Sequence, residues 1–246
     1  MRKYFYDFLL MLQILTRVPI KRSLPCEKKN FKNGANYFCF IGLLIGLSQF
    51  GLFVLLSKII AINFAVIAII IFEILISGAM HLDGFGDTCD GFFAFKGKDK
   101  IIEIMKDSRI GTFACIGIVL NLLIKYQGYS LLAVNLKSIS IILIPVISRF
   151  SMILLSYIGK AAKEEGSGNL FINTVTIKEV IVNIAFVLVI GSLFNSIFQT
   201  AILLIAAIVI TILFNLLCNS KINGITGDTL GANNELVLLI SLMILS

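Results

Sequence analysis

The sequence predicts an all-α, polytopic integral membrane protein with about six to seven spanning helices and an N-terminal interfacial helix. Three observations lead to this fold class. Hydrophobic residues make up 58% of the 246 residues and charged residues only 14%, with a mean hydropathy of +0.99, far from the composition of soluble domains. Apolar stretches of roughly 20 residues, the length that crosses a bilayer core, recur along the chain. Basic residues gather in alternate connections, as in membrane proteins of fixed orientation.

The first predicted element, residues 1–17, is an interfacial helix. Its apolar residues repeat at helical spacing, but Asp7 and Gln13 interrupt a run that is too short to span. A basic connection over residues 18–36 follows. A run of this kind binds nucleic acid in some soluble proteins, but next to a membrane it indicates a juxtamembrane segment, so no nucleic-acid partner is expected.

The predicted spans are residues 37–56, 62–80, 110–134, 139–158, 180–198 and 201–218. Residues 236–246 reach only half that length, so the sequence does not decide whether they cross the bilayer. Because each span changes side, the N-terminal segment and the loops 81–109, 159–179 and 219–235 share one side. They hold 17 of the 21 Lys and Arg residues, whereas Lys58, Lys125 and Lys137 fall opposite. By the positive-inside rule the crowded side is cytoplasmic.

The five cysteines are odd in number and show no paired spacing, so neither a disulfide framework nor a zinc site is predicted. No internal repeat or low-complexity segment interrupts the chain. Residues 1–246 are therefore expected to form a single integral membrane domain.

The chemistry concentrates in the loop that begins at His81. Asp83, Asp87 and Asp90 stand at i, i+4 and i+7, so a helix presents all three carboxylates on one face. Like charges on one face repel, and a hard cation with oxygen ligands, such as Mg²⁺, relieves the repulsion. The alternative is a solvated acidic turn. Glycines at 84, 86 and 91 weaken a purely structural helix and favour a ligand site.

Other candidate residues lie in the remaining cytoplasmic loops and within spans. Asp228 and Glu235 repeat a seven-residue spacing and predict a second acidic surface, although Asp228 alternatively caps a helix that begins near Thr229. Arg149 lies midway along a span, where an unpaired charge is costly, so it needs a phosphate or carboxylate partner. Glu73 is protonated or pairs with Arg149. His81 is either a base or an interfacial hydrogen-bonding group.

At these residues the sequence resembles the adenosylcobinamide-GDP ribazoletransferases, the cobalamin synthases of the late vitamin B12 pathway. The likeness covers nearly the whole chain. It rests on His-Leu-Asp-Gly-Phe-Gly-Asp-Thr-Cys-Asp-Gly at 81–91, Glu-Ile-Met-Lys-Asp-Ser-Arg-Ile-Gly-Thr at 103–112, Ser148-Arg149, Glu-Glu-Gly at 164–166 with Asn169, Thr-Gly-Asp-Thr-Leu-Gly-Ala at 226–232 with Glu235, and the segments 15–19 and 41–46. Departures from the family pattern are Gly86 for alanine, Cys39 for proline, and Glu73 at a position that is usually apolar.

The resemblance implies a magnesium-dependent enzyme of the prokaryotic cytoplasmic membrane whose active site faces the cytoplasm. Such an enzyme joins adenosylcobinamide-GDP to α-ribazole or its phosphate, and releases GMP. The expected metal ligands are Asp83, Asp87 and Asp90; the expected catalytic residues are His81, Asp228, Lys106 and Arg109; the expected substrate-binding residues are Arg149, Ser148, Glu165, Asn169, Thr226 and Glu235. Lys106 and Arg109 would neutralise phosphate charge, from a helix over 99–109 with Asp99 as its N-cap.

Two rival functions fit parts of the sequence. A CDP-alcohol phosphotransferase also uses aspartates, Mg²⁺ and a nucleotide leaving group, but its signature spaces the aspartates more widely than here. A cation transporter would use Glu73 and Arg149 in mid-span, yet it should concentrate its acids within the membrane. The number of metal ions, the identity of the base, the preferred acceptor and homo-oligomer formation are left open by the sequence.

Overall fold

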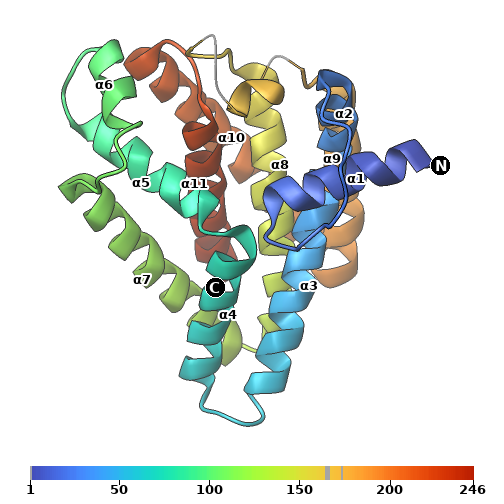
Figure 1. The fold of residues 1–246 in the computed structure, drawn as a ribbon. Coiled ribbons are helices and arrows are strands. Elements are labelled where there is room, and N and C mark those ends of the chain that lie inside the picture. The colour runs from blue at the N-terminus through green and yellow to red at the C-terminus, as the bar shows by residue number, and fades with distance from the viewer. Residues whose placement is uncertain (1, 164–166, 173) are drawn as a thin grey trace.

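The computed structural model describes residues 2–163, 167–172 and 174–246, which form helices joined by short connections (Figure 1). The α-helices are α1 (Arg2–Leu15), α2 (Lys28–Gly34), α3 (Phe38–Leu56), α4 (Ile62–Ser77), α5 (Met80–Phe93), α6 (Lys98–Ile104), α7 (Thr112–Val134), α8 (Leu143–Ile158), α9 (Ile177–Phe194), α10 (Ile197–Ile222) and α11 (Gly227–Leu245). Three short 3-10 helices accompany them, η1 (Ala35–Tyr37), η2 (Ser138–Ile142) and η3 (Ser167–Leu170).

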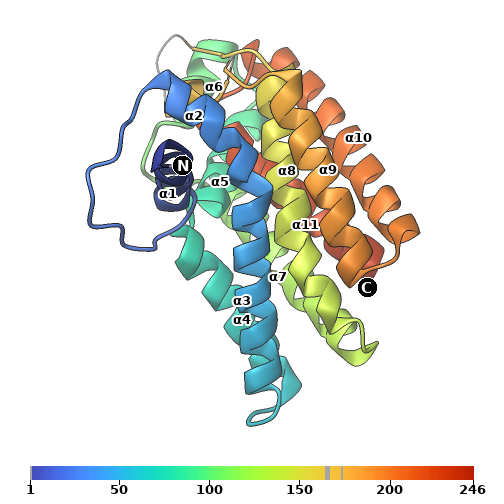
Figure 2. The same ribbon diagram turned by 90° about the vertical axis from the view of Figure 1, so that its right-hand side faces the viewer.

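Within the described residues, six helical segments are long and apolar enough to span a membrane, and the bent pair α4 and α5 makes a seventh when counted as one crossing. The six are α3 with its short N-terminal extension, α7, α8 with η2, α9, α10 and α11. With the short apolar helix α1, this confirms the predicted fold class. Figures 1 and 2 show α2 and α6 at one end of the bundle and the α3–α4 connection at the other.

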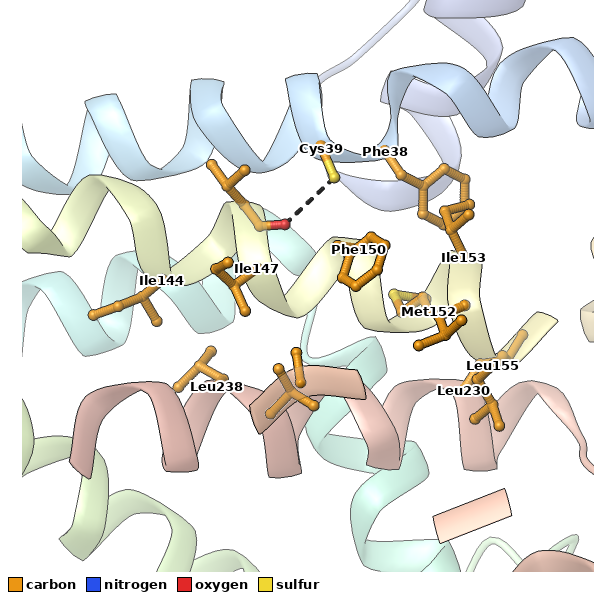
Figure 3. Packing of buried hydrophobic residues seen from close by; sticks show 14 of the residues in the cluster. Phe38, Cys39, Ile144, Ile147, Phe150, Met152, Ile153, Leu155, Leu230 and Leu238 are labelled. Carbon is orange, nitrogen blue, oxygen red and sulfur yellow. Dashed lines mark hydrogen bonds between the residues drawn. The ribbon is translucent and has the colours of Figure 1, made fainter. Parts of the chain in front are cut away.

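Helix α8 is the centre of the bundle. Nearly all of its residues are buried, the polar Ser148, Ser151 and Arg149 included, because neighbouring helices surround it. Figure 3 shows Phe150 and Ile147 of α8 between α3 on one side and α11 on the other. The thiol of Cys39 on α3 points at the carbonyl oxygen of Val146 at 3.5 Å. This cysteine is free and buried, so it is a core residue.

The outer helices expose large apolar side chains. Leu75, Leu123, Leu193 and Ile205 are each more than half exposed on α4, α7, α9 and α10. In water such a surface would be an aggregation hazard, whereas lipid solvates it. The bundle is therefore an integral membrane protein with an internal, partly polar core.

The chain breaks sharply between α4 and α5. Gly78 and Ala79 both have left-handed backbone angles, with φ of 62° and 59°, and the two helices bend by 87° at this point. The carbonyl of Ile76 accepts the backbone N–H of Arg17 at 2.7 Å, so the end of the N-terminal segment secures the bend. As Figure 1 shows, α5 turns away from α4 toward α6 and crosses α11.

Three predictions about the helices are wrong. Residues 219–235 are not a loop, because α11 begins at Gly227 and runs unbroken to Leu245, long enough to span. Helix α6 is N-capped by Gly97 and ends at Ile104, so Asp99 is not its cap. Lys125 does not belong to the outer loop, since its side chain is only 1% exposed inside α7.

The N-terminal helix α1 is tied to α2 by one buried carboxylate. The amide groups of Asn30 and Asn33 donate to Asp7 at 2.6 and 2.9 Å, which compensates the cost of burying the aspartate completely. Figure 2 shows α1 nearly end-on beside α3, so it crosses that helix rather than running parallel to it. This crosswise arrangement agrees with the predicted interfacial helix.

Candidate functional site

The acidic motif forms helix α5 and brings its carboxylates together, as predicted. Asp83 is exposed, and Asp87 and Asp90 are partly buried. Asp83, Asp90 and Asp228 all lie close enough to Asp87 for their negative charges to act on it. Three residues from α5 and one from α11 thus make a strongly negative cluster, which favours a cation among them.

Two glycines allow α5 and α11 to touch backbone to backbone. A Cβ atom on Gly84 would lie 2.7 Å from the carbonyl oxygen of Asp228, and one on Gly231 would lie 3.1 Å from the Cα of His81. Any larger residue at Gly84 would push the helices apart, because its contact is with backbone. This crossing brings Asp228 next to α5 even though 145 positions separate Asp228 from Asp83.

A polar cavity of about 330 Å³ opens on the acidic side of α5. Its walls include Asp83 and Asp87 from α5, and Lys106, Ser108 and Arg109 from the connection between α6 and α7. The structure therefore brings the two predicted phosphate-binding cations to the same cavity as two of the predicted metal ligands. Lys106 and Arg109 are both exposed and accessible to a ligand.

Arg109 is held in place by the neighbouring Asp107. Its guanidinium donates to both oxygens of Asp107, the shortest contact being 2.6 Å. These hydrogen bonds, together with one from the Arg109 backbone, lower the pKa of Asp107 to about 2. Asp107 thus stays ionised at neutral pH and orients Arg109 without a buried contact.

Asp90 has a structural task that the spacing did not reveal. Its two carboxylate oxygens accept the backbone N–H groups of Gly111 and Ala114 at 2.6 and 2.8 Å. Those groups belong to the first turn of α7, where N–H groups lack partners within the helix and the dipole favours a negative charge. Asp90 therefore caps α7 from α5, and it does not line the polar cavity.

At the start of α11 the capping residue is Thr226, not Asp228. The Thr226 hydroxyl accepts the backbone N–H of Thr229 at 3.3 Å, and the Thr229 hydroxyl accepts that of Thr226 at 2.8 Å. The capping alternative for Asp228 is therefore wrong. Asp228 accepts a 3.2 Å hydrogen bond from the Thr226 hydroxyl, and its carboxylate lies close enough to Asp87 to belong to the cluster.

His81 and Arg149 lie buried beneath the acidic cluster. Each is at most 4% exposed, and Arg149 is close enough to His81 for its charge to act on the imidazole. Arg149 donates to Asn234 and, at 3.5 Å, to the hydroxyl of Ser148. Within the described part of the chain, the Nε2 atom of His81 and the Nε atom of Arg149 are buried and have no hydrogen-bond partner.

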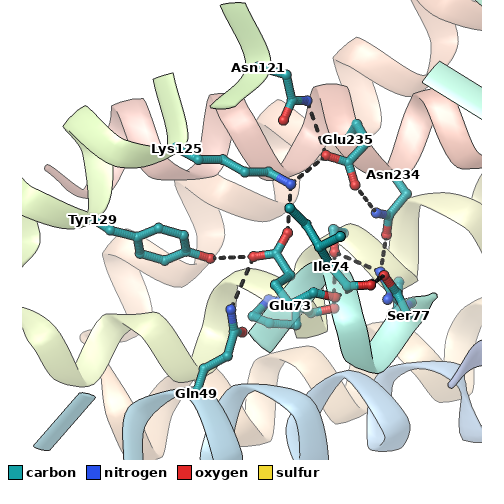
Figure 4. Close-up of polar contacts among 12 residues, drawn as sticks. Gln49, Glu73, Ile74, Ser77, Asn121, Lys125, Tyr129, Asn234 and Glu235 are labelled. Atoms are coloured by element: carbon teal, nitrogen blue, oxygen red, sulfur yellow. Dashed lines mark hydrogen bonds and ion pairs between the residues drawn. The ribbon is translucent and has the colours of Figure 1, made fainter. Parts of the chain in front are cut away.

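A second charge cluster lies within the membrane-spanning helices (Figure 4). The ammonium group of Lys125 contacts the carboxylates of Glu73 and Glu235 at 2.6 and 2.7 Å. The predicted pairing of Glu73 with Arg149 is therefore wrong. Tyr129 and Gln49 each donate to Glu73 at 3.0 Å, so the additional hydrogen bonds that a buried ion pair needs are present.

Glu235 links this cluster to Arg149. Its carboxylate accepts hydrogen bonds from Asn121 at 3.1 Å and from Asn234 at 3.3 Å, and Asn234 in turn accepts from Arg149. Glu235 is only 3% exposed. In this structure its carboxylate contacts Lys125, Asn121 and Asn234.

Of the two predicted residues in the connection between α8 and α9, only Asn169 is described, and it lies away from the acidic cluster. Glu165 lies outside the residues that the structure describes. Asn169 donates to the carbonyl of Lys163 at 2.9 Å and lines a separate cavity of about 590 Å³ with Lys28 and Lys163. The neighbouring Gly168 lies against the first residue of α11.

The donor set suits a hard metal ion only in part. Among the residues that the structure describes, no three His, Cys, Asp or Glu side chains are arranged to hold a metal ion by themselves. Mg²⁺ commonly keeps several waters and takes one or two carboxylates together with substrate phosphates. Asp83 and Asp87 at the wall of an open polar cavity fit that mode of binding.

Sequence reasoning missed the buried partners of the charged residues. Asn121, Lys125 and Tyr129 stand at i, i+4 and i+8 and so share one face of α7, which was a usable signal. Gln49 and Asn234 carried no such pattern. Their roles depend on which helices pack together, which the sequence does not specify.

The chain matches the family model of cobalamin-5-phosphate synthase over residues 7–246. It is similar to the adenosylcobinamide-GDP ribazoletransferase of Clostridium tetani (strain Massachusetts / E88), with 48% identity over 98% of this chain and 96% of that protein. Proteins of the same name from Clostridium kluyveri (strain ATCC 8527) and Clostridium botulinum (strain Langeland) are 43% and 42% identical, each over 100% of this chain and at least 98% of their own length. No solved structure matches the chain. With a full-length likeness of this strength, the chain belongs to the cobalamin-5-phosphate synthase family.

Proposed function

We propose that this protein is an adenosylcobinamide-GDP ribazoletransferase of cobalamin biosynthesis and that its active site is the acidic junction of α5 and α11. It would join adenosylcobinamide-GDP to α-ribazole, or to the phosphate of α-ribazole, and release GMP. The observation that carries the location is the polar cavity, which combines Asp83 and Asp87 with Lys106 and Arg109. Anionic metal ligands and phosphate-binding cations in one cavity are what diphosphate chemistry requires.

In the proposed reaction a hydroxyl oxygen of the ribazole ribose attacks the phosphorus attached to cobinamide. A new P–O bond forms, the P–O bond to GMP breaks, and the hydroxyl proton passes to a base. Lys106 and Arg109 bind the diphosphate oxygens and stabilise the charge that develops on the departing GMP. Asp107 keeps Arg109 oriented for this contact.

Mg²⁺ is part of the proposal, with Asp83 and Asp87 as its ligands. When bound, the ion would neutralise phosphate charge and polarise the reacting phosphorus. Asp90 is the third carboxylate of the predicted set, but both of its oxygens already accept backbone N–H groups of α7. We therefore assign it to holding α5 and α7 together beside the metal ligands.

Two residues are candidates for the base, Asp228 and His81. Replacing Asp228 by Asn keeps the size of the side chain and its contact with Thr226 but removes the charge. We expect a folded protein whose turnover falls at least about a hundredfold, within the ~10²–10⁴ that a positioned acid or base contributes. Steady-state kinetics of the purified Asp228→Asn variant test this. Unchanged turnover would leave His81 as the base.

The proposed orientation puts this active site on the cytoplasmic side of the membrane. Lys125 lies inside α7, so the connections α3–α4, α7–η2 and α9–α10 hold only Lys58 and Lys137 as basic residues. Lys106, Lys163 and Lys221 lie toward the proposed cytoplasmic end. A single cysteine at Lys163, in a chain without native cysteines, should resist an impermeant thiol reagent in intact cells. Labelling of this cysteine from outside the cell would contradict the proposed orientation.

Release of GMP from adenosylcobinamide-GDP by the purified protein tests the function. Release should require both the acceptor and Mg²⁺, and it should match product formation one to one. A transporter would instead produce ion flux in liposomes without GMP release. The transporter reading is already weakened because Glu73 is bound to Lys125 in the core rather than lining a cavity.

A further inference from the structure

A second cavity, of about 190 Å³, adjoins the acidic cluster. It lies among α1, α3, α5, α8, η3 and α11, and Asp83 lines both this cavity and the polar one. His81 and Asp228 also line it. Every residue proposed for the metal or the base, apart from Asp87, therefore borders this second cavity.

Most of the remaining wall is apolar and partly aromatic. Phe38 and Phe171 meet edge to face with their ring centres 5.2 Å apart, and Met80 and Met152 add flexible, polarisable side chains. Aromatic faces and methionine sulfurs favour a flat aromatic ligand. His81 adds a polar residue to this wall, and its Nε2 atom is buried without a hydrogen-bond partner in the described part of the chain.

The two cavities differ in the chemistry that they can bind. The polar one carries the cations for a diphosphate, and the second one carries the surface for a flat apolar group. In phosphoryl transfer the attacking and leaving oxygens lie roughly in line on opposite sides of the phosphorus. Two cavities that meet at Asp83 give the donor and the acceptor separate approaches to one reacting centre.

We propose that the second cavity binds the aromatic base of the nucleoside acceptor and thereby directs its ribose hydroxyl toward Asp83, Asp228 and His81. This inference rests on the proposed function. A cavity of about 190 Å³ accommodates a two-ring base of the benzimidazole type, whereas a corrin macrocycle is far too large. Guanine also fits by size, and the carboxylates of Asp83 and Asp228 suit its N–H groups, so the test below measures the constants for both substrates.

The test compares two substitutions in one aromatic cluster, formed by Phe31, Phe38 and Phe171. Phe171 lines the cavity, whereas Phe31 meets Phe171 edge to face, with ring centres 5.3 Å apart, and is not among the residues that line it. Phe171→Leu removes the aromatic face but keeps apolar volume. We expect it to raise the KM for α-ribazole about tenfold, the lower range for loss of base stacking. The KM for adenosylcobinamide-GDP should stay within about twofold, and Phe31→Leu should leave both constants unchanged.

A second variant tests the cavity by filling it. Ser156 of α8 is buried and lines the cavity. Ser156→Leu should therefore weaken the binding of α-ribazole, measured in the absence of the donor by the fluorescence of the base. The binding of a smaller imidazole riboside should weaken less. Equal effects on the two nucleosides, or a Phe171→Leu effect on the KM of adenosylcobinamide-GDP alone, would overturn the inference. If the wild-type protein releases no GMP with any acceptor, the proposed function itself fails.

Discussion

Replacing Asp83 or Asp87 by Asn should reduce turnover by about two to three orders of magnitude while the protein remains folded. Asn keeps the shape of the side chain but removes the charge that binds a divalent cation, and loss of one preorganised electrostatic contact to a transition state typically costs ~10²–10³ in kcat. Both side chains line the polar cavity. In the described part of the chain neither caps the N-terminus of another helix, as Asp90 does for α7. Initial rates of GMP release at saturating Mg²⁺ measure the effect.

Two further aspartates serve as controls for this prediction. Asp99→Asn changes an exposed aspartate in the first turn of α6, which lines neither cavity, and should leave turnover unchanged. Asp90→Asn should lower stability, because an amide can accept only one of the two N–H groups of α7 through its oxygen; a lost cap costs about 0.5–2 kcal/mol. Near-normal Mg²⁺-dependent turnover in Asp87→Asn would remove Asp87 from the site.

Lys125→Met should be among the most destabilising single substitutions in the protein. It leaves Glu73 and Glu235 buried without the ammonium group that lies 2.6 and 2.7 Å from them. Removing one partner of a buried ion pair typically costs 3–5 kcal/mol, because the remaining charge is uncompensated. Thermal unfolding of the detergent-solubilised protein should show a clearly lower Tm.

A matched control separates burial from pairing. Lys100 contacts Glu103 at the similar distance of 2.7 Å, but both side chains are more than half exposed, so Lys100→Met should change stability by less than about 1 kcal/mol. Adding Glu73→Gln to Lys125→Met should restore part of the lost stability, since one of the two orphaned carboxylates disappears. A double variant that is no more stable than Lys125→Met would contradict the triad of charges.

The sequence predicted the helices best where composition alone determines them. Long apolar runs such as those of α3, α9 and α10 have few alternatives to spanning a bilayer. It missed that α11 is one continuous span, because the polar residues of its first half, including Asn233 and Glu235, are typical of a loop when their partners are unknown. In the structure the Asn233 amide donates to the Ser151 carbonyl on α8 and to Thr211 on α10, so these polar groups are buried inside the bundle.

The acidic face of α5 was predictable because it depends on spacing along one helix. The sequence also offered Asp228 for a second acidic surface, but not the way it is reached, since the contact of α5 with α11 depends on Gly84 and Gly231 at the helix crossing. Glu73 illustrates the same limit. The sequence offered protonation or a pair with Arg149 to offset its charge, and only the fold identifies Lys125 as the residue that neutralises it.

Cleavage of the backbone by iron tests the central claim, that a divalent cation binds where α5 meets α11, most directly. Fe²⁺ in place of Mg²⁺, with ascorbate and peroxide, generates radicals that cut the chain near the bound ion, so the readout does not depend on activity. We expect cuts in α5 near Asp83 and Asp87 and in the first turn of α11 near Asp228, suppressed by excess Mg²⁺ and absent in Asp87→Asn. Cuts confined to other segments, or cuts that persist unchanged in that variant, would contradict a metal site at this junction.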